Sequence, residues 1–151
     1  MIGFGYDSHR LVSDRDLYLG GIKIDSQLGC EAHSDGDALL HAVCDAIIGA
    51  MCMGDIGEHF PDTDPQYKDI SSSVLLARVV ELMEDNGYHV VNIDASVILQ
   101  TPKLAPYKQA IKEHIASICK VAPGRVIPLG IRCSAVFCPL MTRVCPALCP
   151  P

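Results

Sequence analysis

Two histidines and an aspartate near the amino terminus have the residue types of a metal site. Asp7 and His9 are two residues apart on a predicted strand, so their side chains are expected to point to the same face. His41 lies near the start of a predicted helix. Two imidazoles and one carboxylate leave one tetrahedral position open, as in catalytic zinc sites. Alternatively, Asp7 and His9 cap a turn and His41 is a hydrogen-bonded core residue, and spacing alone favours this alternative.

A second group of reactive side chains occupies a glycine-containing turn. Residues 33–37 have the sequence His-Ser-Asp-Gly-Asp and precede a predicted helix. Because first-turn amides of a helix attract anions, a phosphate is the expected ligand. The alternative is a capping turn with an incidental histidine. Residues 55–57 and 60–64 form an acidic loop that could bind hydroxyl groups or a metal, although most acidic loops are only solvated.

Several common active-site motifs are missing from the sequence. Gly3-x-Gly5 lacks the third glycine of a dinucleotide-binding fingerprint, because Ser8 occupies that position. The glycines at positions 49 and 54 have the spacing of a P-loop, but Asp55 stands where that motif has lysine. No G-x-S-x-G elbow and no H-E-x-x-H motif occurs.

The composition indicates one acidic globular domain. The chain has 151 residues, is 49% hydrophobic and carries a formal charge of −6, which opposes nucleic-acid binding. The longest apolar stretch, residues 38–53, contains His41 and Asp45 and is shorter than the roughly 20 residues of a membrane span. We therefore expect no membrane insertion. No signal peptide is visible, so the expected location is cytoplasmic and the eight cysteines are expected to be reduced.

The elements that must position these residues alternate between strands and helices. Strands are predicted at residues 2–6 and 90–99, and a diglycine turn joins a hairpin of residues 17–19 and 22–24. Apolar spacing predicts helices over residues 38–53, 72–86 and 105–119. This order indicates an α+β or α/β layer fold, in which helices pack on one face of a mixed sheet.

The composition changes abruptly near Arg125. Every acidic residue lies at or before Glu113, whereas residues 126–151 contain half of the cysteines and half of the prolines. The Cys138-Pro139 and Cys145-Pro146 pairs oppose a central strand, because proline lacks a ladder donor. Residues 126–131 are the candidate strand of this tail. Its cysteine spacing matches structural zinc patterns only loosely.

Several motifs in order resemble the 2-C-methyl-D-erythritol 2,4-cyclodiphosphate synthase family. They are Gly-Tyr-Asp-Ser-His-Arg from residue 5, Leu-Gly-Gly from 19, Ala-His-Ser-Asp-Gly-Asp from 32, Leu-His-Ala from 40, Gly-Asp-Ile-Gly from 54, Phe-Pro-Asp-Thr-Asp from 60 and Gln-Thr-Pro-Lys-Leu from 100. The resemblance covers residues 1–125. It reverses the preference at the first site, where a metal centre becomes the favoured interpretation.

The resemblance implies a homotrimeric enzyme of non-mevalonate isoprenoid synthesis, with active sites between subunits. Such an enzyme cyclises 4-diphosphocytidyl-2-C-methyl-D-erythritol 2-phosphate and releases CMP. Asp7, His9 and His41 would hold Zn²⁺, His33 would assist the transition state, and Mg²⁺ or Mn²⁺ would fill a second site. The implied substrate contacts are Asp7, Ser8, His9, His33, Ser34, Asp55, Ile56, Gly57, Phe60, Pro61, Asp62, Thr63 and Asp64, and for cytidine diphosphate Leu99, Gln100, Thr101, Pro102, Lys103, Leu104 and Ala105.

The tail departs from the family pattern. The family continues with a Thr-Thr-Glu-Lys-Leu-Gly-Phe type motif whose glutamate serves the second metal ion, and this chain has no acidic residue after Glu113. We interpret residues 126–151 as translated from a shifted reading frame. A coding sequence without that motif in another frame would refute this interpretation. The alternative functions are a catalytically impaired zinc- or nucleotide-binding remnant and a metal-dependent phosphohydrolase.

Overall fold

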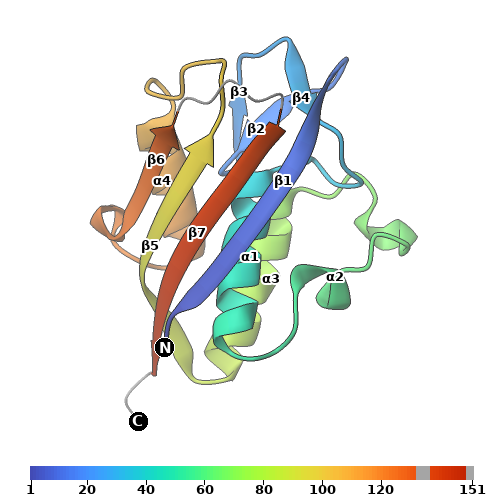
Figure 1. Ribbon diagram of the computed structural model, residues 1–151. Helices are drawn as coiled ribbons and strands as arrows, with labels where there is room; N and C mark the ends of the chain where they lie inside the picture. Colours follow the sequence, from blue (N-terminus) through green and yellow to red (C-terminus); the bar gives the residue numbers. More distant parts are fainter. Residues whose placement is uncertain (132–136, 149–151) are drawn as a thin grey trace.

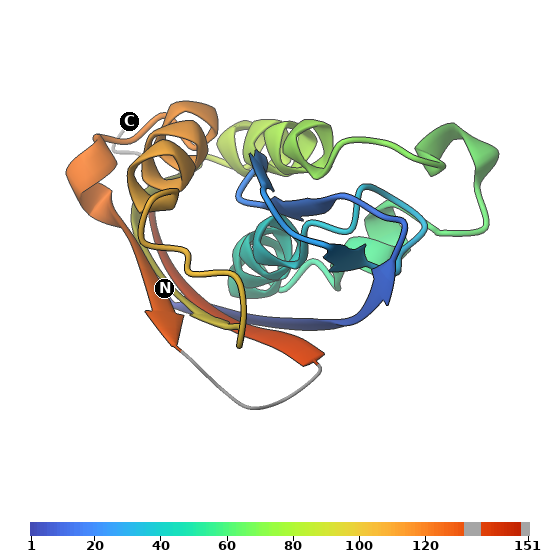
Figure 2. The same cartoon turned by 90° about the horizontal axis from the view of Figure 1, so that it is seen from above.

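Five strands form one mixed sheet, and the three long helices cover one of its faces. The computed structural model describes residues 1–131 and 137–148. The sheet order is β4-β1-β7-β5-β6, and a separate hairpin pairs β2 with β3. Figure 1 shows the sheet in front of the helices, and Figure 2 shows that its other face is left open. The α+β class expected from the sequence is confirmed.

The elements follow one another along the chain with short connections. Their bounds are β1 Gly3–Ser13, β2 Leu17–Leu19, β3 Ile22–Ile24, β4 Leu28–Cys30, α1 Ala38–Ala50, α2 Ile56–His59, η1 Pro65–Tyr67, α3 Ser72–Asp85, β5 Tyr88–Ile98, α4 Lys108–Ile118, η2 Pro123–Arg125, β6 Val126–Ile131 and β7 Phe137–Leu148. The short 3₁₀ helices are labelled η. β5 and β6 are parallel, whereas β7 is antiparallel to both of its neighbours.

Most predicted elements are present with shifted ends. The hairpin has the predicted bounds, and Gly20 and Gly21 both adopt positive φ in its turn. α1 ends before the predicted residue 53, because Cys52 and Gly54 take left-handed conformations that a helix cannot contain. α3 ends one residue before the predicted limit. α4 begins three residues later than predicted, at Lys108.

The expectation that proline opposes a central strand in the tail is wrong. β7 runs through both Cys-Pro pairs and lies between β1 and β5 in the middle of the sheet. A proline removes only its own N–H, so the remaining residues of a long strand still pair. Pro146 lies opposite Val90, beside a register irregularity in β5, and irregular pairing is where sheets tolerate proline. The expected strand at residues 126–131 is confirmed as β6, at the sheet edge.

The structure bears on two sequence expectations, one about membrane insertion and one about the cysteines. Among the described residues, none of the helices has both the length and the apolar character needed to cross a membrane. Cys44, Cys52 and Cys119 are free thiols, and burial raises the pKa of Cys119 to about 12. The tail cysteines lie outside the described side chains.

The core forms where α1 lies directly on β1. α1 is buried around most of its surface because it contacts the sheet on one side and α3 on the other. Gly3 and Gly5 allow this contact: a Cβ added at Gly5 would lie 1.9 Å from the Ala42 carbonyl oxygen, and one at Gly3 would lie 1.7 Å from that of Ala46. Glycine is therefore required at both positions, and α1 lies closer to β1 than any side chain would allow.

This close contact predicts different effects for two glycine substitutions. Gly5→Ala forces α1 away from β1 and is expected to lower the free energy of unfolding by about 1–3 kcal/mol, as overpacked core sites do. Gly49→Ala is the matched control, because Gly49 is an exposed residue of α1 and a Cβ added there would meet no other part of the structure within 4 Å. That variant is expected to gain up to about 1 kcal/mol from helix propensity. Urea unfolding measures both, and equal stability of the two variants would contradict the close-packing argument.

Candidate metal centre and substrate pocket

The structure brings Asp7, His9 and His41 together at one point. Asp7 and His9 come from the helix-facing side of β1, and His41 comes from the first turn of α1. Asp7 Oδ2 lies 2.9 Å from His9 Nε2 and 3.1 Å from His41 Nδ1, and the two nitrogens are 3.3 Å apart. Among the described side chains, these form the one cluster of three His, Cys, Asp or Glu residues able to hold a metal ion.

The donor set and spacing fit a small divalent cation. Ligands about 2.0–2.1 Å from a tetrahedral zinc ion lie about 3.3 Å from one another, close to the spacing of these three atoms. One carboxylate oxygen and two imidazole nitrogens are typical zinc ligands, and three protein ligands leave a position for substrate. The side chains of Asp7, His9 and His41 are 13–22% exposed, so a ligand can still reach the site. The residues therefore fit the metal that the sequence predicted.

The electrostatics of the cluster favour an ionised aspartate. Burial raises the pKa of Asp7, but the hydrogen bonds with His41 and His9 outweigh burial and hold the pKa well below its usual range. The hydrogen bond with Asp7 raises the pKa of His9, against the opposing effect of burial. The carboxylate therefore stays negative at neutral pH and provides the charge that would balance a bound cation.

A network of buried polar groups supports the opposite side of His41. His41 Nε2 lies 2.9 Å from Ser72 Oγ and 3.2 Å from Ser34 Oγ. Ser72 also contacts Asp35 through its hydroxyl, and its amide donates to Asp35 Oδ2 at 2.9 Å. Ser34 accepts from the Gly36 amide at 3.2 Å. His41 is therefore held through both ring nitrogens.

Asp37 fixes the start of α1 and ties it to the β2-β3 hairpin. Its carboxylate is fully buried and accepts the Leu40 amide at 3.1 Å, which caps the helix. It also accepts the Gly20 amide at 2.9 Å and the Gly21 amide at 2.5 Å. Burial raises the pKa of Asp37, and the three amide donors oppose that shift. The sequence predicted the cap but not the link to the hairpin.

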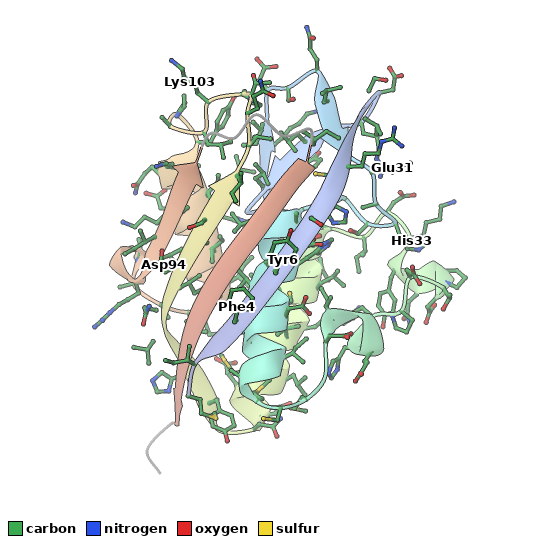
Figure 3. The ribbon with its side chains drawn as sticks, in the orientation of Figure 1. Phe4, Tyr6, Glu31, His33, Asp94 and Lys103 are labelled. Atoms are coloured by element: carbon green, nitrogen blue, oxygen red, sulfur yellow. The ribbon has the colours of Figure 1, made fainter. Side chains whose placement is uncertain are left out.

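A pocket of about 410 Å³ opens beside the cluster. It is lined by residues from both predicted sites: His9, Ala32, His33, Ser34, His41, Ile56, Gly57, Phe60, Pro61, Asp62, Tyr67, Ile70 and Leu75. The two histidines of the metal cluster therefore share one cavity with much of the acidic loop and with His33 and Ser34 of the turn at residues 33–37, called the phosphate turn below. The exposed His33 lies between β4 and α1, on the same side of the molecule as this loop (Figure 3).

Other expected contact residues lie outside this pocket. Asp55 caps α2 through the Glu58 amide, at 3.0 Å, and Asp64 caps η1. Thr63 is not among the residues that line the cavity. Ser8 is exposed on the other face of β1 from Asp7, because alternate residues of a strand point to opposite faces.

The residues expected to bind cytidine diphosphate lie elsewhere in this chain. Leu99, Gln100, Thr101 and Pro102 line a second pocket of about 450 Å³, together with Leu11 and residues 25–28. Lys103 is exposed, Leu104 is buried in the core, and Ala105 is exposed. Figure 3 shows Lys103 and His33 at well-separated edges of the molecule. One chain therefore does not unite the nucleotide residues with the metal cluster.

Sequence reasoning missed several residues of the metal-side pocket. Tyr67, Ile70 and Leu75 supply apolar wall, and the Tyr67 ring packs edge-on against Phe60 at 5.5 Å between centroids. Their apolar character just after the acidic loop was the available signal. Asp45, one turn after His41 in α1, accepts the Ile56 amide at 2.8 Å and so holds the start of α2. Burial raises the pKa of Asp45.

Comparison with known proteins assigns the chain to a family. The model of the YgbB family matches residues 1–127. The chain belongs to the YgbB family. A relative from Geobacter sulfurreducens, named 2-C-methyl-D-erythritol 2,4-cyclodiphosphate synthase, is 52% identical over 125 residues that cover 83% of this chain and 80% of that protein. A relative of the same name from Syntrophotalea carbinolica is 54% identical over 125 residues, 83% of this chain and 76% of that protein.

Solved structures of YgbB-type proteins share the fold described above. A structure of 2C-methyl-D-erythritol-2,4-cyclodiphosphate synthase matches with a TM-score of 0.93 and 35% identity, over 97% of this chain and 100% of that one. A second structure of that enzyme, described as its CDP-bound form, matches with a TM-score of 0.92, 35% identity and the same coverage. The family resemblance expected from the sequence motifs is thus confirmed.

Changing either type of side chain in the Asp7, His9 and His41 cluster is expected to weaken zinc binding strongly. His41→Ala and Asp7→Asn each change a candidate direct ligand, so affinity should fall by more than the roughly 100-fold that loss of an outer partner reaches. His89→Ala is the matched control, since His89 is exposed on β5 and far from this cluster in sequence and fold. Competition with a colorimetric chelator measures the affinity. Stoichiometric, tight zinc in His41→Ala would contradict the site.

Proposed function

We propose that this protein cyclises 4-diphosphocytidyl-2-C-methyl-D-erythritol 2-phosphate to 2-C-methyl-D-erythritol 2,4-cyclodiphosphate and releases CMP. The observation that carries the proposal is the Asp7, His9 and His41 cluster at the edge of a pocket that also contains the phosphate turn and the acidic loop. Relatives at 52–54% identity are named for this activity. The enzyme would be a phosphorus-oxygen lyase of non-mevalonate isoprenoid synthesis, located in the cytoplasm.

The reaction forms one phosphorus-oxygen bond and breaks another. An oxygen of the 2-phosphate attacks the β-phosphorus of the cytidine diphosphate, a new P–O–P bond forms, and the bond from that phosphorus to the CMP oxygen breaks. No water is consumed, so the protein must bring the ends of the substrate together and stabilise the developing charge. Zn²⁺ held by Asp7, His9 and His41 would orient a phosphate and neutralise its charge, which the acidic chain itself does poorly.

The remaining pocket residues have separate proposed roles. His33 donates a hydrogen bond to the reacting phosphates, and Ser34 contacts the substrate beside it. The acidic loop binds the sugar-alcohol part of the substrate, and its carboxylates accept hydrogen bonds from the hydroxyls. This loop comprises Asp55, Ile56, Gly57, Phe60, Pro61, Asp62, Thr63 and Asp64. The segment comprising Leu99, Gln100, Thr101, Pro102, Lys103, Leu104 and Ala105 binds cytidine diphosphate, with Lys103 facing the phosphates. The metal-side pocket and the nucleotide segment must lie next to each other for one substrate molecule to contact both.

A homotrimer would bring the two halves together between neighbouring subunits. Two observations support it: the nucleotide segment and the metal cluster occupy separate pockets in one chain, and large apolar side chains are exposed at the start of β1, on the open face of the sheet. Ile2 is 77% exposed, and Phe4 and Tyr6 are each 52% exposed. Figure 3 shows Phe4 and Tyr6 on the face of β1 that is turned away from the helices. Exposed apolar patches of this kind mark protein interfaces.

The tail makes a catalytically impaired remnant the second candidate. The family's second-metal glutamate has no counterpart after Glu113, so a bound Mg²⁺ or Mn²⁺ would lose that ligand. Loss of charge stabilisation of this kind costs on the order of 100-fold or more in rate. The family model ends at residue 127, near the change in composition, which supports the proposal that residues 126–151 come from a shifted reading frame.

Product analysis tests the proposed reaction. Purified protein and authentic substrate are expected to give CMP and the cyclic diphosphate, and a chelator should stop both. His33→Ala should lower kcat by on the order of 100-fold, as loss of a hydrogen-bond donor that stabilises transition-state charge does, while the exposed His89→Ala should not. A linear phosphate product would instead indicate a phosphohydrolase. Bound zinc without CMP release would indicate the impaired remnant.

The trimer is tested by sedimentation. The wild-type protein should have three times the 16.3 kDa mass of the chain. Tyr6→Glu places a charge among the exposed apolar residues at the start of β1 and is expected to give monomers without activity. Val74→Glu is the control, because Val74 is also an exposed apolar residue, 44% exposed, but lies on α3. A monomeric wild type, or equal effects of the two variants, would contradict the trimer.

A further inference from the structure

His41 uses its two ring nitrogens for different purposes. Nδ1 faces Asp7 Oδ2 and His9 Nε2, at 3.1 and 3.3 Å. Nε2 faces the Ser72 hydroxyl at 2.9 Å. A neutral imidazole carries one N–H, so only the other nitrogen has a free lone pair. Metal binding requires that lone pair on Nδ1, and the proton must therefore be held on Nε2.

The hydrogen-bond partners of Ser72 favour a proton on Nε2 of His41. Asp35 Oδ1 lies within hydrogen-bonding distance of the Ser72 hydroxyl and accepts its hydrogen. The single hydroxyl hydrogen of Ser72 is therefore donated to Asp35. Towards His41 the serine oxygen has only a lone pair left, so it accepts from Nε2–H. The chain from Asp35 through Ser72 to His41 thus has one direction.

The surroundings of Ser72 agree with a hydroxyl that donates to Asp35 and accepts from His41. Ser72 is 0% exposed, so no bulk water competes for its hydroxyl. The hydroxyl is not used to cap α3, because Ser71 does so by accepting the Ser73 amide at 3.3 Å. Ser34, which accepts the Gly36 amide, lies 3.2 Å from Nε2 and offers the same N–H a second oxygen. Two oxygens therefore meet Nε2, as expected of a donor, whereas Asp7 Oδ2, 3.1 Å from Nδ1, competes for the proton until a metal takes its place.

This chain of contacts also joins the metal cluster to a loop that lines the pocket. Asp35 accepts the Ser72 amide at the point where the loop of residues 60–71 enters α3. The Asp35 amide donates to the Ile70 carbonyl at 3.1 Å, and the Asp69 amide donates to the His33 carbonyl at 2.9 Å. The loop end and the phosphate turn are thus fixed to each other beside His41.

We propose that Asp35 and Ser72 are positioning residues, which hold the proton of neutral His41 on Nε2 and so present Nδ1 to a divalent metal. The inference rests on the metal site of the proposed function and deepens it. Partners behind a ligating histidine set its tautomer and ring orientation, and their loss typically costs 10–100-fold in metal affinity. The side chain that acts directly on His41 is Ser72, and Asp35 acts through Ser72.

Ser72→Ala and Ser73→Ala form a matched pair for the test. Both remove a hydroxyl from the first turn of α3, and both hydroxyls lie 2.9 Å from a histidine Nε2: Ser72 at His41 and Ser73 at His114. Ser72→Ala is expected to lower zinc affinity about 10–100-fold in chelator competition. Ser73→Ala should retain the wild-type affinity. Ser72→Thr, which keeps the hydroxyl, should restore much of the loss.

Nitrogen-15 spectra of the metal-free protein give a readout that a general loss of packing would not move. In the wild type Ser72 favours a proton on Nε2 and Asp7 competes for one on Nδ1, so Ser72→Ala should raise the share of His41 that is protonated on Nδ1. Asp35→Asn keeps the serine hydroxyl but can donate to it, which frees that hydroxyl to donate to Nε2. This variant should move the proton towards Nδ1 and weaken zinc binding. It tests the positioning role independently if Ser72→Ala lowers the unfolding temperature.

Failure of the inference is distinct from failure of the proposed function. Wild-type zinc affinity together with an unchanged His41 tautomer in Ser72→Ala and Asp35→Asn overturns the positioning role. Equal losses in Ser72→Ala and Ser73→Ala overturn it too, because the effect would then belong to α3 in general. A wild-type protein that binds no zinc overturns the metal site itself, and with it the basis of both proposals.

Discussion

The contact between β1 and α1 is the constraint on which the rest of the structure depends. The missing side chains of Gly3 and Gly5 let the helix lie directly on the strand. The same strand then carries Asp7 and His9 on its helix-facing side, and the first turn of the helix supplies His41. Because β1 and the first turn of α1 lie at a fixed distance from each other, the three candidate ligands meet on regular elements. No loop has to become ordered to bring them together.

The proposed chemistry explains why an acidic protein can handle a highly charged phosphate substrate. The net charge of −6 would repel such a substrate over most of the surface. A divalent ion at one point, held by a single carboxylate and two neutral rings, reverses the local sign. The buried groups behind His41 and the fully buried Asp37 then act as scaffold, since their hydrogen bonds are satisfied within the protein.

Local patterns predicted much of the fold, and long-range pairing explains most of what they missed. The hairpin, α1, α3 and β5 follow from turn glycines and apolar spacing, which act over a few residues. The central position of β7 could not be predicted, because it depends on pairing with the long strands β1 and β5. The prolines of β7 itself favour the opposite prediction. The metal triad needed the family motifs, since spacing alone cannot show that residue 41 returns to residues 7 and 9. Asp45 and Tyr67 gave still weaker signals, because Asp45 acts through a hydrogen bond from the Ile56 amide and Tyr67 through a ring contact with Phe60.

The central claim is that one aspartate and two histidines, and not the cysteines of the tail, form the metal centre of this protein. X-ray absorption at the zinc edge of the zinc-loaded protein tests it most directly. We expect only nitrogen and oxygen neighbours at about 2.0–2.1 Å, with the outer-shell scattering of two imidazole rings. Sulfur neighbours at about 2.3 Å, or a single imidazole, would contradict it.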